Sequence, residues 1–205
     1  MAEKWILEVQ KRAKQGKPII TSGRGENYKK IDFSDLIFMP AQLTTRPKDY
    51  FREEIKTETI LGKTSNKPLK LSMPILTAAM SFGALSAGAK IALAKGSTIA
   101  GTADNTGEGG MLKEQKENAK LIIAQYSTGR FGVDEEYLKG ADAIEVKIGQ
   151  GAKPGQGGLL PKEKITEKIA EVRKVTRNQD VHSPPYHSDI NNIDDLRKKV
   201  EWLRE

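Results

Sequence analysis

Apolar and polar positions recur at helical spacing in residues 1–15, which predicts an amphipathic helix at the start of the chain. Its apolar face is formed by Trp5, Ile6, Val9 and Ala13. A glycine and a proline within residues 16–18 end this pattern. Residues 17–70 then mix short apolar pieces with polar turns, which predicts an irregular extension. Within it, the alternation over residues 57–61 predicts one strand of a small hairpin that ends near Leu71.

From Leu71 onward the pattern becomes regular, because short apolar runs alternate with amphipathic segments. The runs predict strands at residues 74–78, 98–101, 121–125 and 143–148. The amphipathic segments predict helices at residues 86–95, 112–119, 134–138 and 163–175, and a last helix from Asn192 on. Ser86 and Asn192 are suitable N-caps, and Gly96 is suited to end the first of these helices. Strands that alternate with helices predict a parallel sheet with right-handed crossovers.

The predicted fold class is therefore α/β, with the first four to five βα units of a (β/α)8 TIM barrel. Four units can be counted, and a fifth strand is weakly marked near Asp180. A complete barrel needs eight units and about 250 residues. We expect residues 1–70 to form the N-terminal helix and irregular extension, and residues 71–205 to form the half-barrel. An open parallel sheet has an unpaired edge strand, which favours association.

Composition narrows the possible functions. The net charge is +7, but Lys and Arg are interspersed with acids and aromatic residues are 6% of the chain, which favours solvated helix faces over a nucleic-acid interface. No apolar run approaches the roughly 18 residues of a membrane span, and the start lacks a signal-peptide core, so we expect a cytoplasmic protein. The absence of cysteine excludes disulfides and Cys-ligated clusters. With only two histidines, we predict no metal site.

Glycine-rich or polar segments follow each predicted strand, at the end of a barrel where active sites form. They cover residues 79–86, 102–110, 125–132 and 149–158. Small residues there let a flat ring approach the backbone. The amides of Asn105, Gln125 and Gln150 can pair with a ring that has both donors and acceptors. Lys147 can place positive charge beside an electron-rich cofactor, and Arg130 can clamp a carboxylate.

Each of these features also has a simpler structural interpretation. A glycine-rich loop can be only a turn. Lys147 can be an ordinary ion-pair partner, for example of Glu145, which can itself be a structural acid. His187, in the turn at residues 182–187, can lie in a surface or subunit-contact loop or can touch a substrate. The residues reveal no Ser/His/Asp arrangement for nucleophilic catalysis.

Taken together and in order, these loops resemble the FMN-binding domain of glutamate synthase, in particular the stand-alone archaeal-type large subunit. The resemblance extends over about residues 32–205 and covers the N-terminal half of that domain. It rests on the segments Phe38–Leu43, Ala79–Ser86, Gly101–Gly110, Gly129–Gly132 and Gln150–Gly155.

The resemblance implies a flavin-dependent barrel that adds ammonia to 2-oxoglutarate and reduces the product with reduced FMN, which gives L-glutamate. The candidate substrate-binding residues are Met80, Ser81, Phe82, Gly83, Asn105, Glu108 and Arg130. The candidate FMN-binding residues are Ala78, Ala79, Met80, Asn105, Gln125, Lys147 and Gln150.

The chain also departs from the family pattern. Ala78 and Ala79 stand where relatives often carry Ser or Gly, and Tyr186 and Ser188 interrupt a Pro-Pro-Pro-His-His-Asp stretch. A later lysine-bearing strand, a phosphate-binding loop and the three cysteines of a 3Fe–4S cluster are absent from this sequence. We therefore expect no complete catalytic set within the chain.

Three hypotheses about function stay open, and whether the chain is an enzyme is left undecided. In the first, it is a fragment that is active with a complementing C-terminal half-barrel polypeptide, a glutamine amidotransferase subunit and an electron-donor subunit. In the second, it is an inactive remnant. In the third, it is a non-enzymatic half-barrel that serves as an association module and self-associates.

Overall fold

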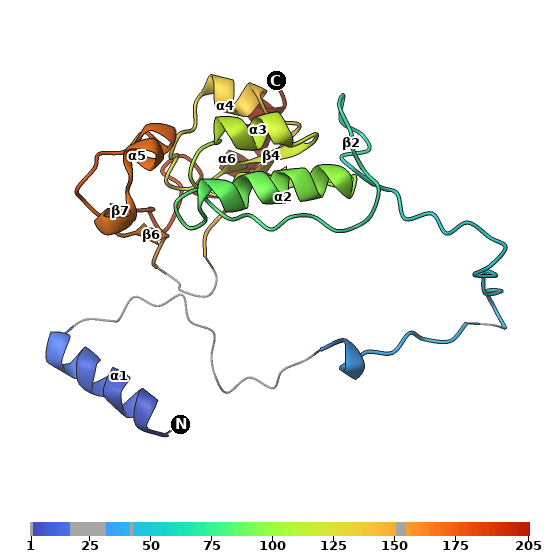
Figure 1. The fold of residues 1–205 in the computed structure, drawn as a ribbon, viewed down its shortest axis with the longest axis horizontal. Coiled ribbons are helices and arrows are strands. Elements are labelled where there is room, and N and C mark those ends of the chain that lie inside the picture. Colours follow the sequence, from blue (N-terminus) through green and yellow to red (C-terminus); the bar gives the residue numbers. More distant parts are fainter. Residues whose placement is uncertain (1, 17–31, 42, 151–154) are drawn as a thin grey trace.

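The structure, a computed structural model, describes residues 2–16, 32–41, 43–150 and 155–205 (Figure 1). Pro18 of the predicted helix stop, Gln42 and residues 151–154 of the predicted site loop lie outside these ranges.

The described residues before position 59 contain little regular structure besides the predicted first helix. That prediction is confirmed by helix α1, Ala2–Gln15. A single 3-10 turn, η1 at Phe33–Asp35, is capped by Asp32, whose carboxylate accepts a hydrogen bond from the Ser34 amide at 2.7 Å. Figure 1 shows α1 and η1 apart from the α/β body. From residue 36 to residue 58, the described residues form no helix or strand.

The predicted hairpin is also confirmed. Strand β1, Thr59–Leu61, pairs antiparallel with β2, Leu69–Leu71. Leu69 and Leu71 alternate with an exposed lysine and are buried against Ala103 and Ile123. The hairpin therefore covers one face of the main sheet.

The main sheet is parallel and has the strand order β3-β4-β5, as the alternation of elements predicts. Its strands are β3, Asp104–Asn105, β4, Ile122–Tyr126, and β5, Ala143–Val146. The helices α2, Ala87–Ile99, α3, Lys113–Asn118, and α4, Glu135–Lys139, precede or separate them. No sheet closes on itself within the described residues, so the structure shows an α/β fold and not the barrel itself.

Two predicted strands are wrong. Residues 74–78 are extended but belong to no sheet, and the side chain of Ile75 is 64% exposed. One side of this segment bonds to residues 102 and 103, with the Thr77 amide donating to the Ala103 carbonyl at 3.2 Å. Its other side has no neighbouring strand among the described residues. A segment at the edge of a sheet, with irregular hydrogen bonds on one side, does not form the regular backbone pairing of a strand.

The second wrong strand, residues 98–101, overlaps the end of α2, because Gly96 does not end that helix. A single glycine is tolerated inside a helix. The left-handed residue that follows the helix is Gly101, with φ +65°, which suits a glycine after a C-cap. Strand β3 consequently begins only at Asp104.

The C-terminal part differs from the prediction in the division of its helix and in the pairing of its strands. The predicted helix at 163–175 is divided into the 3-10 turn η2, Lys162–Lys164, and α5, Glu167–Arg173, because Thr166 caps a new helix start. The predicted loop before it contains β6, Leu159–Leu160. This strand pairs antiparallel with β7, Val181–His182, so the fifth strand near Asp180 exists but does not join the parallel sheet.

The last helix is confirmed as α6, Ile193–Arg204, with the Asn192 side chain accepting from the Asp195 amide at 2.9 Å. In the described part of the chain, no helix is both long and apolar enough to cross a membrane.

The main apolar cluster joins the loop after residue 80 to the C-terminal elements. Phe82 from that loop packs with side chains of α5 and of the β6–β7 pair. The buried members are Phe82, Leu112, Leu160, Ile165, Ile169 and Val181. This packing holds the loop at residues 81–83 next to α5, and so shapes the site below.

Candidate functional site

Side chains of the three parallel strands meet at one carboxylate. Gln125 of β4 and Glu145 of β5 are register partners, and the Gln125 amide donates to Glu145 Oε1 at 2.5 Å. Asn105, the last residue of β3, donates from Nδ2 to Glu145 Oε2 at 3.2 Å. Glu145 is therefore a partner of two amides and not of Lys147.

A buried lysine, which the sequence analysis does not single out, joins the Met80 loop to the end of β3. Lys90 of α2 is fully buried, and its ammonium donates to the carbonyls of Met80 at 2.7 Å, Asn105 at 2.7 Å and Thr106 at 3.3 Å. Burial lowers the pKa of Lys90 to about 8, although the nearby Asp104 carboxylate opposes this. The signal in the sequence is a lysine on the buried face of α2, in line with Ala94.

Gly107 brings the same two loops into backbone contact. Its φ is +65°, and a Cβ added there would lie 2.5 Å from the Met80 carbonyl carbon and from the Ser81 nitrogen. Met80 and Asn105, which the sequence places in separate loops, thus lie together in the fold.

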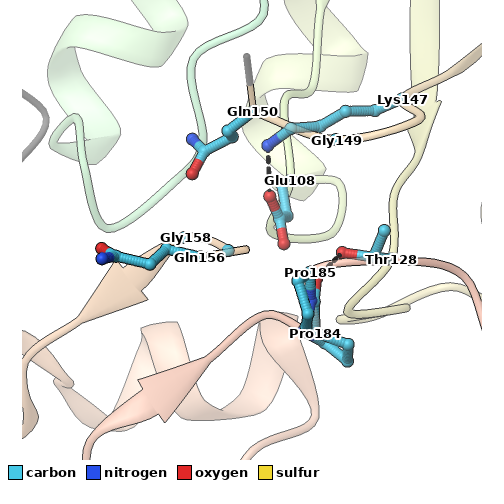
Figure 2. Close-up of a pocket in the computed structure, with 10 residues that line it drawn as sticks. Glu108, Thr128, Lys147, Gly149, Gln150, Gln156, Gly158, Pro184 and Pro185 are labelled. Carbon is cyan, nitrogen blue, oxygen red and sulfur yellow. Dashed lines mark hydrogen bonds and ion pairs between the residues drawn. The ribbon is translucent and has the colours of Figure 1, made fainter. Parts of the chain in front are cut away.

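A second cluster is centred on an ion pair. Lys147, directly after β5, lies 2.5 Å from Glu108 Oε2, and the Ser183 hydroxyl donates to the same carboxylate. Figure 2 shows this pair with Gln150 beside it. The simpler interpretation of Lys147 as an ion-pair partner is thus met, but its partner is Glu108, from the loop that follows β3.

The hollow beside this pair is small. It holds at most about 170 Å³ and is lined by Glu108, Thr128, Lys147, Gln150, Gln156 and Pro184, among others (Figure 2). Pockets that bury a ligand of drug size measure roughly 300–1,000 Å³, so the hollow itself does not hold a whole flavin. The side-chain oxygens of Gln150 and Gln156 are buried without a hydrogen-bond donor among the described residues. Such acceptors are suited to a ligand that donates.

Arg173, at the end of α5, is a further residue that the sequence analysis does not identify. It is buried, and it donates from Nε to the Phe82 carbonyl and from Nη2 to the Ser81 hydroxyl, both at 2.9 Å. A Cβ added to Gly109 would lie 3.0 Å from its guanidinium nitrogens. Burial lowers the pKa of Arg173, with Glu108 opposing the effect. No Asp or Glu of the described ranges forms an ion pair with it within 4.0 Å.

Other candidates lie in different environments. The Phe82 side chain lies in the apolar core, whereas Ala78 and Ala79 are exposed. Arg130, predicted to clamp a substrate carboxylate, forms an ion pair with Asp189 at 2.6 Å and lies 3.6 Å from the centre of the Tyr126 ring. A substrate carboxylate would have to compete with Asp189.

His187 is buried, although Pro184, Pro185 and Tyr186 of the same loop are exposed. Its Nε2 lies 2.7 Å from the Lys147 carbonyl and its Nδ1 lies 2.8 Å from Arg130 Nη1. Since the carbonyl accepts at Nε2 and the guanidinium donates at Nδ1, the ring is neutral with its proton on Nε2. It thereby fixes the backbone at Lys147.

We expect His187 to make the protein sensitive to acid. Burial lowers the pKa of His187 below its ordinary 6.5, so the unfolded chain takes up this proton at a higher pH than the folded chain. The contribution of His187 to stability is complete above about pH 6.5 and is lost as the pH falls through the folded-state pKa. Urea midpoints measured from pH 7.5 downward should fall less steeply in His187→Gln than in wild type. The exposed His182→Gln is the control, and an identical decline in all three proteins would contradict the assignment.

The part of the chain that the structure describes contains no group of three or more His, Asp or Glu residues arranged to hold a metal ion.

Comparisons with known proteins give a consistent result. The family model described as "Conserved region in glutamate synthase" matches residues 10–205. A glutamate synthase large subunit-like protein of Rhizobium meliloti is 42% identical over 184 residues, which cover 89% of this chain and 42% of that protein. An archaeal glutamate synthase (NADPH) of Methanocaldococcus jannaschii is 39% identical over 226 residues, which cover 97% of this chain and 44% of that protein. The glutamate synthase (NADPH) large chain of Bacillus subtilis is 39% identical over 155 residues, which cover 68% of this chain and 10% of that protein.

The chain spans less than half the length of each of these relatives. The family match nevertheless covers most of this chain, including every loop described above. On this match, the chain belongs to the glutamate synthase family.

Proposed function

We propose that the chain forms the face of a glutamate synthase site that holds 2-oxoglutarate and the flavin ring, for reductive amination of 2-oxoglutarate to L-glutamate. The observation that carries this proposal is the meeting of Met80, Asn105 and Gln125 at one end of the parallel sheet. The Glu108–Lys147 pair lies at the same end. Because the relatives are more than twice as long, we propose that a complementing C-terminal half-barrel supplies the rest of the site.

The residues present fit the ring of FMN better than its phosphate. An amide at Gln125, an ammonium at Lys147 and an unpartnered oxygen at Gln150 suit a ring that has both donors and acceptors. When bound in reduced form, FMN would supply the hydride. Lys147 would hold positive charge beside the ring, which stabilises its reduced form. In barrels the phosphate is bound by loops after strands 7 and 8, which we assign to the complementing half.

Arg173 and Glu108 suit two further steps, the binding of 2-oxoglutarate and the deprotonation of ammonium. The guanidinium uses two donors on the Ser81–Phe82 turn and has others left, so a 2-oxoglutarate carboxylate would satisfy both its charge and its geometry. The carboxylate of Glu108 can accept a proton from ammonium, which leaves ammonia free to attack the keto carbon. Ser183 and Lys147 would hold that carboxylate in place.

We expect Arg173→Gln to weaken 2-oxoglutarate binding by about 10- to 100-fold, because a hydrogen bond to a charged group contributes roughly 1.5–3 kcal/mol. The measurement is calorimetric titration of 2-oxoglutarate into the chain mixed with its complementing half and FMN. Arg177→Gln is the matched control, since Arg177 is exposed shortly after α5. Equal affinity in both variants would remove Arg173 from the substrate site.

The alternative, a non-enzymatic association module, is favoured by a different observation. Among the described residues, the segment at residues 74–78 has hydrogen-bond partners on one side only, and it exposes Ile75 and Leu76. Such an edge pairs readily with another chain. The inactive remnant is the third outcome, and it predicts neither flavin binding nor association.

One experiment separates these outcomes. FMN is titrated at micromolar concentration into the purified chain, alone and with a polypeptide that carries the second half of a relative's FMN domain, and the flavin absorbance bands are followed. The proposal expects FMN binding and, with 2-oxoglutarate, ammonium and a reductant, formation of glutamate in the mixture. A mixture that binds no FMN contradicts it, and dimers without FMN binding support the association module. We further propose a cytoplasmic enzyme served by a glutamine amidotransferase subunit and an electron-donor subunit.

A further inference from the structure

We infer that Glu145 is a positioning residue that fixes which end of the Gln125 amide faces the flavin site. The inference deepens the proposed function and rests on it for the identity of the ligand. It begins from one geometric fact, which is that the two oxygens of a single carboxylate each bind a side-chain amide from a different neighbouring strand.

The three residues lie on the same face of the sheet. Gln125 and Glu145 are register partners in adjacent parallel strands, so their side chains point to the same side. Ile123, two residues before Gln125, shares that side and packs against Leu69 and Leu71 of the hairpin. The hairpin covers this face at Ile123, which is the register partner of Asn105, and Gln125 and Glu145 lie further along it, toward the carboxyl ends of the strands.

A carboxylate determines the orientation of an amide that it binds. An ionised carboxylate can only accept hydrogen bonds, whereas an amide has one donating and one accepting end. Glu145 therefore holds the NH₂ groups of both Asn105 and Gln125. The other end of Asn105 is also occupied, because its Oδ1 accepts from the Gly107 amide at 2.9 Å.

The side-chain oxygen of Gln125, in contrast, has no hydrogen-bond donor among the described residues. Gln125 is 6% exposed, and its Oε1 receives no hydrogen bond from any residue in the described ranges. The polar surface thus presents an acceptor at Gln125 and a donor at Lys147. The pyrimidine edge of a flavin carries two carbonyl oxygens on either side of one N–H, at N3. An acceptor at Gln125 matches N3–H, and the ammonium matches a carbonyl.

Glu145 is thereby expected to determine specificity for a ring that donates at this position. Replacing it by glutamine puts an amide where the carboxylate stood. The new amide can donate to Gln125 Oε1, so the Gln125 amide is free to turn over. Glu145 itself is exposed, so this change should leave the fold intact.

The first arm of the test needs no flavin. The side-chain NH₂ resonances of Asn105 and Gln125 are compared by 15N NMR in wild type, Glu145→Gln and the control Glu171→Gln, an exposed acid on α5. Loss of a charge-assisted hydrogen bond should move both pairs of resonances upfield in Glu145→Gln only. Unchanged resonances would overturn the inference, whether or not the chain binds FMN.

The second arm compares FMN with N3-methyl-FMN as ligands of the chain with its complementing half. Wild type should prefer FMN by about tenfold, the equivalent of one lost hydrogen bond, and this preference should fall below about threefold in Glu145→Gln. Stability alone would not change such a ratio. An unchanged preference in the variant overturns the inference, whereas absence of FMN binding in wild type counts against the proposed function and leaves the decision to the first arm.

Discussion

Replacing Lys90 by methionine should lower the free energy of unfolding by about 3–5 kcal/mol, the range found when one partner of a buried charge pair is removed. The Lys90 side chain has no exposed surface, and its ammonium is bound by three backbone carbonyls. Methionine fills similar space but leaves those carbonyls without a donor. It also leaves the fully buried Asp104 carboxylate without the positive charge beside it. Chemical denaturation followed by circular dichroism measures the loss.

A double variant tests this explanation. Asp104→Asn removes the uncompensated charge while an amide oxygen can still accept from Gln115 Nε2, as Asp104 Oδ2 does at 2.7 Å. Lys90→Met with Asp104→Asn should therefore be more stable than Lys90→Met alone. If adding Asp104→Asn lowers stability further, the loss of positive charge near Asp104 is not the cause.

The same lysine should make wild-type stability rise with pH. Its folded-state pKa is about 8 and its ordinary value is 10.5, so between these values the unfolded chain holds the proton while the folded chain releases it. At about 1.4 kcal/mol per pKa unit, the rise is of the order of 3 kcal/mol. The difference between wild type and Lys90→Met should grow over this range, and a constant difference would contradict the assignment.

Gly107→Ala is expected to have the second largest effect, a loss of about 3 kcal/mol or more. A non-glycine residue at φ +65° costs about 1 kcal/mol, and here the new methyl group would also lie 2.5 Å from backbone atoms of Met80 and Ser81. Backbone cannot move aside as a flexible side chain can. The substitution should push the Met80 turn away from the end of β3, and hydrogen exchange of the Ser81–Gly83 amides should become faster.

Gly96→Ala is the matched control for Gly107→Ala. Gly96 lies inside α2, has no positive φ, and a Cβ there would meet nothing within 4 Å. Alanine should therefore raise stability by about 0.5–1 kcal/mol, opposite in sign to Gly107→Ala. Equal effects of the two substitutions would show that glycine content, and not the loop contact, determines the outcome.

Hydrophobic periodicity predicts those elements of this fold in which buried positions recur regularly along the sequence. Residues 121–124 are an unbroken apolar run before Gln125, and the buried strand β4, Ile122–Tyr126, lies largely within the predicted range 121–125. The strands β6 and β7 contain two residues each, which is too short for any period to appear. The end of α2 was misplaced because Gly96 and Gly101 look alike in sequence, and only the backbone conformation distinguishes them.

Some residues of the candidate site can likewise be predicted from the sequence, and others cannot. Polar residues at strand ends, such as Asn105 and Gln125, can be found from sequence because parallel strands bring their carboxyl ends together. Lys90 and Arg173 could not, because a lysine or arginine on a helix is usually solvated. Their roles depend on burial, which arises from contacts between distant segments, such as Arg173 with Phe82.

Lys147 is held at two points, since His187 binds its backbone carbonyl and Glu108 binds its ammonium. A free lysine side chain samples many rotamers, and immobilising it opposes association by up to roughly 2 kcal/mol. Here that ordering takes place during folding, before any ligand arrives. An anion or an electron-rich ring would therefore meet a charge already in position, and its affinity should depend little on how mobile the free site is.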